Sequence, residues 1–232
     1  MLNPDGRVIM VSGANRGIGK EVAKRLREQG YSLSLGARQP SKLDFDDAVL
    51  THVWDATSAT DSQAWVDATI KHFGHIDGVV LNAGVLLEVG LVEGSDEDLD
   101  TLWAVNFKGP LKLIRAALPA LQASGHGRVV NITSLAGKRL LSPNGLGYAA
   151  SKHASMALTH AIRQFGWDSG LRATAVCPGL VDTEMVDNVD PPTGQFKIPP
   201  SAIADSVTYA LALPNEASVA ELLVNSRLEL SI

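Results

Sequence analysis

The feature that most restricts the fold of this chain is an alternation of short apolar runs with longer segments of helical periodicity. Short apolar runs are typical of strands buried on both faces, and the helical segments between them are long enough to cross over a parallel sheet. The pattern therefore predicts βαβ units. We expect strands at Val8–Ser12, Ser32–Leu35, His52–Trp54, Gly78–Leu81, Arg128–Ile132, Arg172–Cys177 and Glu221–Val224.

The segments between the strands carry their apolar residues on one stripe. After the first strand, Ile18, Val22 and Leu26 recur at helical spacing. Similar signals cover Asp96–Gln122, Leu146–Trp167 and Ser201–Leu213. No repeat or linker interrupts the pattern. We therefore predict a single α/β domain over residues 1–232, a doubly wound sheet of about seven parallel strands with helices on both faces.

Composition excludes several classes of protein. The 232 residues are 45% hydrophobic, enough for one sizeable core, and the net charge of -5 with scattered Lys and Arg argues against a nucleic-acid partner. The N-terminal residues do not resemble a secretory signal, and no apolar stretch approaches the roughly 20 residues that span a bilayer. We expect a soluble, cytoplasmic protein. The lone Cys177 has no partner at metal-ligand spacing, so no metal site is expected.

Polar clusters follow the strands at their carboxyl ends, where ligands bind in open α/β sheets. These clusters are Ser12–Gly19, Ala37-Arg38, Asp55, Asn82–Gly84, Ser134 and Pro178–Thr183. Because they lie in register along one edge of the predicted sheet, we expect them to form a single site.

The first cluster is a glycine-rich turn between the first strand and the first helix. In Ser12-Gly13-Ala14-Asn15-Arg16-Gly17-Ile18-Gly19 the glycines let backbone N–H groups approach a phosphate at the positive end of the helix. The spacing Gly-x-x-x-Gly-x-Gly differs from the common dinucleotide fingerprint. Taken alone, the turn could be a simple strand-to-helix connection.

Together with later motifs, this spacing resembles that of the short-chain dehydrogenase family. The motifs in family order are Asn82-Ala83-Gly84, Asn106, Ser134, Tyr148-Ala149-Ala150-Ser151-Lys152, and Pro178-Gly179 with Thr183. The resemblance covers nearly the whole chain and implies a Rossmann-like, single-domain oxidoreductase. It implies catalytic roles for Asn106, Ser134, Tyr148 and Lys152. It implies cofactor binding by Gly13, Asn15, Arg16, Gly17, Ile18, Gly19, Arg38, Asp55, Asn82, Ala83, Gly84, Tyr148, Lys152, Pro178, Gly179, Val181 and Thr183.

Some individual roles are also implied by the resemblance. The Asn-Ala-Gly turn lines the adenosine side, Pro178–Thr183 covers the nicotinamide, Lys152 binds the nicotinamide ribose and Asn106 supports a water chain. For Asp55, contact with the adenine and a local capping role before Ala56-Thr57 remain equally open.

Charge at the end of the second strand favours NADP(H) over NAD(H). NAD-specific sites place an acidic residue there, whereas a 2′-phosphate requires a cation. Here the strand runs into Gly36-Ala37-Arg38, and Arg16 in the glycine turn offers a second guanidinium. Either arginine could instead be a solvated surface charge.

Tyr148 and Lys152 are four residues apart, which places them on one face of a helix. We expect the Lys152 ammonium and an oxidised nicotinamide to lower the phenol pKa from its usual value near 10. Tyr148 then transfers the proton while Ser134 holds the substrate oxygen. By itself such a Tyr and Lys pair is often only structural.

The substrate remains open between a 3-hydroxy acid and a hydrophobic ketone. The C-terminal part resembles 3-hydroxy acid and serine dehydrogenases, whose carboxylate would need a cation such as Lys138, Arg139 or Lys197. The apolar alternative would use Leu86, Leu140, Leu141 and Met185. Residues 183–200 contain many turn-forming residues and are expected to form a mobile loop on the substrate side.

Small residues on the helix of Tyr148 permit close helix packing, and the family resemblance implies a homodimer or homotetramer. Two other functions stay open. A non-catalytic NADP-sensing protein would keep the fold without the chemistry, and a methyltransferase would use the glycine turn for adenosylmethionine but leaves the Tyr and Lys pair unexplained. An epimerase is disfavoured because the chain has no substantial C-terminal substrate domain.

Overall fold

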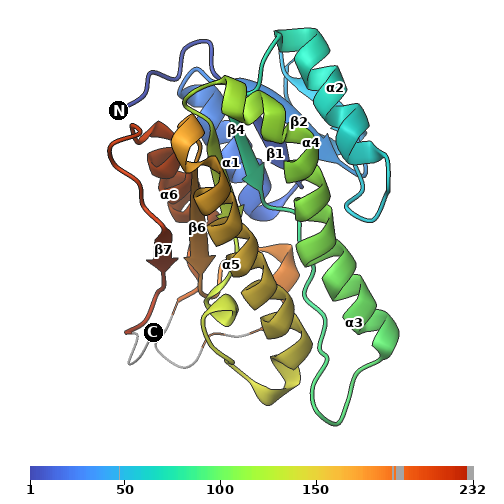
Figure 1. Ribbon diagram of the computed structural model, residues 1–232. Coiled ribbons are helices and arrows are strands. Elements are labelled where there is room, and N and C mark those ends of the chain that lie inside the picture. The colour runs from blue at the N-terminus through green and yellow to red at the C-terminus, as the bar shows by residue number, and fades with distance from the viewer. Residues whose placement is uncertain (47, 190, 192–195, 229–232) are drawn as a thin grey trace.

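One parallel sheet organises the molecule, with helices on both of its faces (Figure 1). The computed structural model describes residues 1–46, 48–189, 191 and 196–228. Within them, the strands run in the order β3-β2-β1-β4-β5-β6-β7, and every neighbouring pair is parallel. The strands are β1 (Val8–Ser12), β2 (Ser32–Ala37), β3 (Leu50–Val53), β4 (Gly78–Leu81), β5 (Arg128–Ile132), β6 (Arg172–Pro178) and β7 (Glu221–Val224).

Helices connect the strands and lie in two layers. They are α1 (Gly17–Glu28), α2 (Asp61–Phe73), α3 (Asp96–Trp103), α4 (Gly109–Ala123), α5 (Leu146–Gly166) and α6 (Pro200–Ala212). A π-helical turn at Ala104–Lys108 joins α3 to α4, so that the two form one long helix in Figure 1. None of the helices among the described residues combines the length and apolar character needed to cross a membrane.

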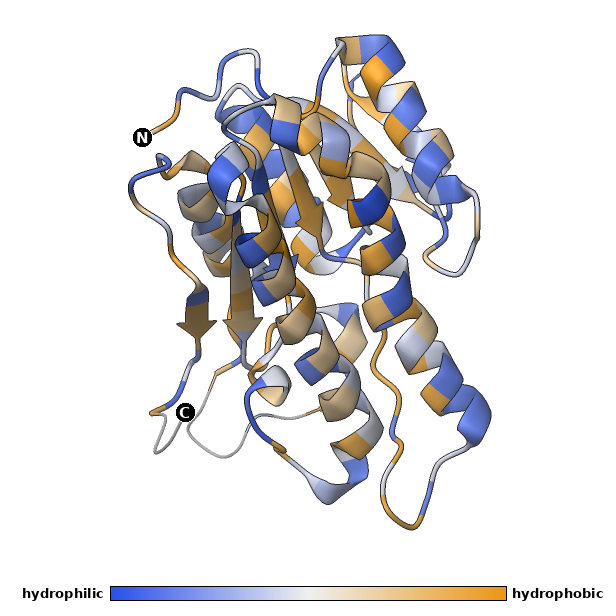
Figure 2. Ribbon diagram, in the orientation of Figure 1, coloured by the Kyte–Doolittle hydropathy of each residue, from blue (hydrophilic) through white to orange (hydrophobic). Residues whose placement is uncertain are grey.

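Both faces of the sheet are buried, because successive side chains of a strand point to opposite sides. In β1, Ile9 and Val11 pack with α1 and α6, while Met10 packs with α2, α4 and α5 on the other side. Figure 2 shows mostly apolar central strands between helices that carry both apolar and hydrophilic residues. This explains why the strands read as unbroken apolar runs rather than alternating ones.

The predicted fold class is confirmed, and each predicted strand overlaps an observed one. Between β2 and β3, the described residues contain a short 3-10 turn at Pro40–Lys42 and no α-helix. Three details differ: α2 had no predicted counterpart, the long helix Asp96–Gln122 contains the π turn, and the last helix begins at Pro200.

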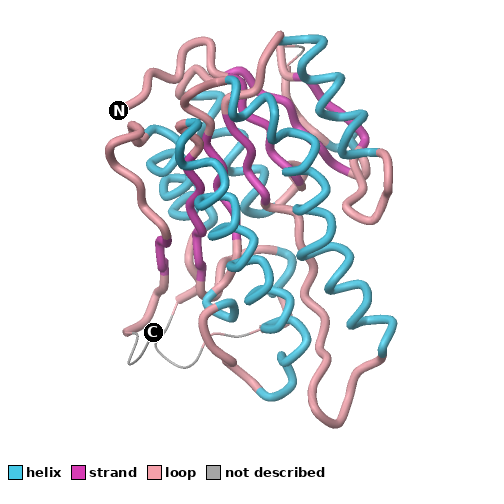
Figure 3. The backbone as a smooth tube through the Cα atoms, in the orientation of Figure 1, coloured by secondary structure: helices cyan, strands magenta, loops and turns pink. Residues whose placement is uncertain are grey.

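Long connections gather beyond the carboxyl ends of the strands, at the lower end of Figure 3. Part of the loop expected at residues 183–200 is ordered against the core. A 3-10 turn spans Glu184–Val186, and Ile198 forms a β-bridge with Val181. Residues 190 and 192–195 of this loop lie outside the described residues, and its mobility stays a prediction.

Candidate active site

A cavity of about 1320 Å³ opens at the carboxyl edge of the sheet. It collects nearly all the site residues predicted from the sequence: Gly13, Asn15, Arg16, Gly17, Ile18, Arg38, Asp55, Asn82, Ala83, Gly84, Ser134, Tyr148, Lys152, Pro178, Gly179, Val181 and Thr183. The predicted residues Gly19 and Asn106 do not line the cavity, and both lie next to residues that do. The residues come from the ends of six strands and from the helices α1 and α5, and the parallel sheet brings them together.

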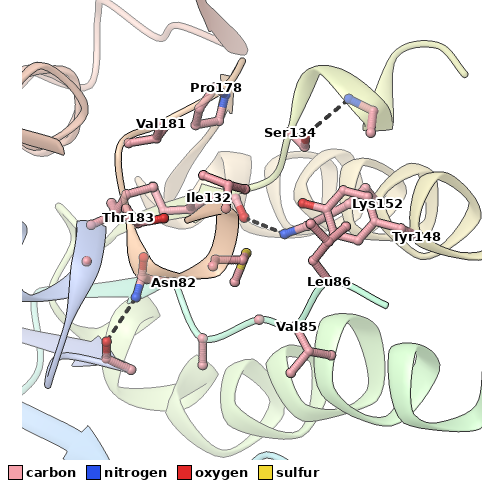
Figure 4. Close-up of a pocket in the computed structure, with 18 of the residues that line it drawn as sticks. Asn82, Val85, Leu86, Ile132, Ser134, Tyr148, Lys152, Pro178, Val181 and Thr183 are labelled. Carbon is pink, nitrogen blue, oxygen red and sulfur yellow. Dashed lines mark hydrogen bonds between the residues drawn. The ribbon is translucent and has the colours of Figure 1, made fainter. Parts of the chain in front are cut away.

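The glycine-rich turn is held in place by the end of β4. The side chain of Asn82 donates to the carbonyl oxygens of Ser12 (3.0 Å) and Gly13 (3.1 Å). In return, the Ser12 hydroxyl accepts from the backbone N–H groups of Asn82 and Ala83. Asn82 therefore stabilises the turn through hydrogen bonds and also lines the cavity (Figure 4).

Gly19 explains why the turn can lie so close to its helix. A Cβ atom at this position would be 2.3 Å from the Gly13 carbonyl oxygen and 2.4 Å from Nδ2 of Asn82. No side chain fits there. The contribution of Gly19 to a nucleotide site is therefore indirect, through the shape of the turn.

The N-terminus of α1 faces the same turn. Its N-cap residue is Arg16, whose side chain makes no capping hydrogen bond. Gly17, the first helical residue, has a φ of +52°, and a Cβ there would meet Thr183 at 3.3 Å. First-turn N–H groups of a helix have no partners within the helix, and together with the helix dipole they favour an anion.

Cationic residues surround the far end of the cavity, beyond β2. Arg38 follows this strand and Lys42 lies in the next turn, and both line the cavity. Arg16 forms an exposed ion pair with Glu184 (3.0 Å), which joins the glycine turn to the segment after β6. Coulombic attraction by Arg38 also reaches Asp55.

Asp55 is engaged locally. One carboxylate oxygen accepts from the backbone N–H and the hydroxyl of Thr57, both at 2.7 Å. These hydrogen bonds, with a smaller effect from Arg38 and Lys112, lower the Asp55 pKa. Of the two roles left open by the sequence, the local one is present as a turn after β3 rather than as a helix cap, since the N-cap of α2 is Thr60. Asp55 nevertheless lines the cavity.

Tyr148 and Lys152 stand together on α5, as their spacing predicts. The Lys152 Nζ lies 5.8 Å from the centroid of the Tyr148 ring and donates to the carbonyl of Ile132 (3.1 Å). Figure 4 shows both side chains directed at the end of β5, where Ser134 follows Ile132. Ser134 lies near enough to Tyr148 to lower its pKa, so a hydroxyl, a phenol and an ammonium gather at the same part of the cavity wall.

Burial controls the protonation of this group. Desolvation raises the pKa of Tyr148 to about 12, and Ser134 opposes the rise only in part. Desolvation likewise lowers the pKa of Lys152 to about 8. With the groups of the chain alone, the phenol pKa therefore moves upward, because the loss of water outweighs the effect of Ser134. The lowering expected in the presence of an oxidised nicotinamide stays a prediction.

Asn106 does not line the cavity but stabilises two parts of its wall through hydrogen bonds. It lies in the π turn, and its side chain accepts from the Val85 N–H (2.9 Å) while donating to the Val85 carbonyl (3.0 Å). It also donates to the Ser151 hydroxyl (3.0 Å), which donates in turn to the Tyr148 carbonyl (2.7 Å). Sequence reasoning gave Ser151 no role, although its position three residues after Tyr148 places it on the same side of α5.

The residues proposed for the substrate side divide into two groups. Leu86, Leu141 and Met185 line the cavity, and Leu140 does not. The proposed cations are also absent from its surface: Lys138 pairs with Glu221 (2.6 Å), Lys197 donates to the Val186 carbonyl (2.9 Å), and Arg139 lies off the cavity. A different cation, Arg227, lines it instead.

Comparisons with known proteins agree with this arrangement. The family model described as short chain dehydrogenase matches residues 7–193. Agropine synthesis reductase of Rhizobium rhizogenes is 40% identical over 218 residues, which make up 91% of this chain and 50% of that protein. The chain thus spans about half the length of this relative.

A second relative matches along its whole length. An uncharacterized oxidoreductase of Staphylococcus epidermidis is 34% identical over 224 residues, covering 94% of this chain and 96% of that protein. Among solved structures, the alcohol dehydrogenase from the archaeon Thermococcus sibiricus, complexed with 5-hydroxy-NADP, superposes with a TM-score of 0.87 and 31% identity. That match covers 96% of this chain and 99% of the archaeal one.

Proposed function

This chain belongs to the short-chain dehydrogenase family, and from that premise we propose that it interconverts a carbonyl and a secondary alcohol with NADP(H), Tyr148 transferring the proton. One observation carries the proposal. Ser134, Tyr148 and Lys152 line the same cavity as the N-terminus of α1, whose free N–H groups suit an anion.

The residues of the cavity fit a nicotinamide dinucleotide. Gly17 leaves the space that a pyrophosphate needs at the start of α1, and Arg38 stands where an adenosine ribose would lie. Pro178, Val181 and Thr183 form the wall on the nicotinamide side (Figure 4). The similar archaeal enzyme holds 5-hydroxy-NADP, which supports this assignment. When bound, the cofactor supplies the hydride or accepts it.

The chain itself handles the proton. With a pKa raised to about 12, Tyr148 is protonated at neutral pH and can donate to an oxygen that gains negative charge. Ser134 adjoins the Tyr148 hydroxyl and can hold the same oxygen. Asn106 and Ser151 position this pair without touching the cavity. Asn106 hydrogen-bonds with the backbone of Val85 in the facing wall, and Ser151 hydrogen-bonds with the backbone of Tyr148.

Replacing Tyr148 with Phe tests the proposal. The change removes one hydroxyl, so we expect turnover of NADPH with a carbonyl panel to fall by roughly 10²- to 10⁴-fold, the usual contribution of a positioned acid or base. The NADPH dissociation constant should change by less than about threefold, since the ring remains. Tyr209→Phe, on the exposed surface of α6, is the matched control and should keep full turnover.

Two results would contradict the proposal. Near-normal turnover by Tyr148→Phe would remove this residue from the chemistry. NADPH binding by the wild-type protein without turnover of any carbonyl would instead indicate a non-catalytic NADP-sensing protein.

The preference for NADP(H) rests on charge around the adenosine ribose. No acidic residue ends β2, and Arg38 follows it directly. Arg16 supplies a second cation at the cavity, although it is shared with Glu184. We expect NADPH to bind at least tenfold more tightly than NADH in a fluorescence titration at low salt, because a guanidinium pairs strongly with a phosphate. Tighter binding of NADH would overturn the preference.

A further inference from the structure

We propose that Arg227 binds the carboxylate of the substrate, and that the natural substrates are oxo acids or the corresponding hydroxy acids with an apolar side chain. This inference rests on the proposed function and adds the class of substrate to it. Its starting observation is that Arg227, which no sequence motif distinguishes, lines the cavity.

The strand order places Arg227 at the catalytic end of the cavity. It follows β7, which is separated from β2 by four other strands. At about 4.8 Å per strand, the end of β7 is roughly 24 Å from the adenosine end but only about 10 Å from the end of β5, where Ser134 lies. Arg227, an exposed residue three positions after the end of β7, therefore lines the cavity on the side of Ser134 rather than on the adenosine side.

Local contacts support the same placement. The backbone N–H of Gly179 donates to the Val224 carbonyl (2.8 Å), so the chain leaving β7 runs beside the Pro178-Gly179 turn. A Cβ at Gly179 would lie 2.3 Å from the Asn225 side chain and 3.4 Å from Leu135, the residue after Ser134. Val224 and Asn225 thus lie beside the wall that adjoins Ser134, and Arg227 follows two residues later.

The other cations that line the cavity have different positions or partners. Arg38 and Lys42 lie beyond β2, Arg16 pairs with Glu184, and Lys152 donates to the Ile132 carbonyl. Among the described residues, no hydrogen bond or ion pair engages the Arg227 side chain. Arg227 is therefore the cation available to a ligand at the catalytic end.

The surroundings define the rest of the ligand. Leu86, Leu141, Met185 and Val189 line the cavity and offer apolar contacts to a ligand, beside polar residues such as Glu88 and Asn144. A guanidinium binds a carboxylate through two parallel hydrogen bonds, which also fixes the orientation of the bound molecule. A cation together with these apolar side chains suits a molecule with one carboxylate, one carbonyl and an apolar side chain.

The reaction leaves the carboxylate unchanged. Hydride from NADPH forms the new C–H bond at the carbonyl carbon, the π electrons move to the oxygen, and that oxygen takes the proton of Tyr148. NADPH is oxidised to NADP⁺ and the ketone is reduced to a secondary alcohol. The carboxylate held by Arg227 would serve only to orient the carbonyl toward Ser134 and Tyr148.

The test compares oxo acids with their methyl esters as substrates for the wild-type protein, Arg227→Gln and Arg227→Lys. The panel varies the number of carbons between carboxylate and carbonyl. We expect Arg227→Gln to lower kcat/KM for the preferred oxo acid by roughly 10- to 100-fold, mainly through KM, since hydrogen bonds to charged groups are worth that much. The ester should change by less than threefold, and Arg227→Lys should recover part of the loss.

A control variant and a binding measurement complete the test. Arg115→Gln removes the same charge from the exposed surface of α4 and should leave the acid-to-ester ratio unchanged. In the presence of NADPH, the hydroxy acid product should raise the melting temperature of the wild-type protein more than that of Arg227→Gln.

Equal losses for acid and ester, or no loss for either, would overturn the role of Arg227. If the wild-type protein reduces esters and neutral ketones at least as well as oxo acids, the substrate class is wrong while the proposed function stands. If it reduces no carbonyl at all, the proposed function fails, and this inference fails with it.

Discussion

Lys152 is held in an environment that opposes its charge. It is only 6% exposed, and burial lowers its pKa from 10.5 to about 8. In the unfolded chain the amine keeps its ordinary pKa and binds a proton up to pH 10.5. Between pH 8 and 10.5 the unfolded state therefore binds more protons than the folded one, and stability from this group rises with pH. Tyr148, with its raised pKa, acts in the opposite direction only above pH 10.

Lys152→Met should remove this dependence. Over pH 8 to 10 we expect the free energy of unfolding of the wild-type protein to rise by roughly 2 kcal/mol relative to the variant. Other groups titrate in both proteins and cancel in the difference. Urea unfolding at pH 7, 8, 9 and 10 measures it. Lys108→Met, at an exposed position, should give a difference that does not vary with pH. A constant difference for Lys152→Met would show that its burial does not restrain its charge.

At the same scale, sequence reasoning identified which residues meet but not how each one acts. Tyr148, Ser134 and Lys152 were found because their types and order follow a family pattern. The upward pKa of Tyr148 could not be found in that way, because it depends on burial by residues from distant parts of the chain. Arg227 was missed for a related reason: only the pairing of β7 with β6 brings it to the cavity.

At the scale of secondary-structure elements, the connection from β1 to α1 has no room for a side chain at Gly19. The Cβ of a Gly19→Ala variant would clash with the Gly13 carbonyl and the Asn82 side chain. The hydrogen bond between these two groups stabilises the glycine turn. We expect this variant to bind NADPH at least tenfold more weakly and to melt several degrees lower, since overpacking typically costs about 1–3 kcal/mol. Fluorescence titration and thermal unfolding measure the two effects.

Gly145→Ala is the control for this prediction. Its Cβ would have open space, although Gly145 lines the same cavity. It should bind NADPH normally and melt within about 1 °C of the wild-type protein, in keeping with a site free of steric conflict. Unchanged NADPH affinity in Gly19→Ala would mean that the turn is not the phosphate site.

The one helix without a predicted counterpart, α2, shows the limit of apolar periodicity. Its buried stripe is Ser62, Trp65, Val66 and Thr69, which has helical spacing but two polar members. The hydroxyls are satisfied inside the protein: Ser62 accepts from the Trp54 indole, and Thr69 pairs with Ser34 (2.7 Å). Because a hydropathy scale treats Ser62 and Thr69 as polar, the pattern of apolar residues alone does not predict this helix. Their partners lie on other elements, and the segment itself gives no sign of them.

For the molecule as a whole, the alternation of apolar runs was sufficient to predict a doubly wound sheet. This alternation did not predict the order of the strands. The order follows from the packing of α1 and α6 on one face and of α2, α4 and α5 on the other. The site depends on that order, because β1, β4, β5 and β6 must be neighbours for their terminal loops to share one cavity.

The packing of α1 against α6 also affects how the protein is made. Val22 and Leu26 of α1 share one apolar cluster with Ile203 and Val207 of α6 on the same face of the sheet, and Arg25 pairs with Asp205. About 180 residues separate these partners in the chain. During translation, α1 therefore leaves the ribosome long before α6. The apolar residues of α1 that contact α6 stay exposed until α6 has been synthesised. This face of the sheet closes last, so it is where a chaperone would bind the nascent chain and where premature aggregation would begin.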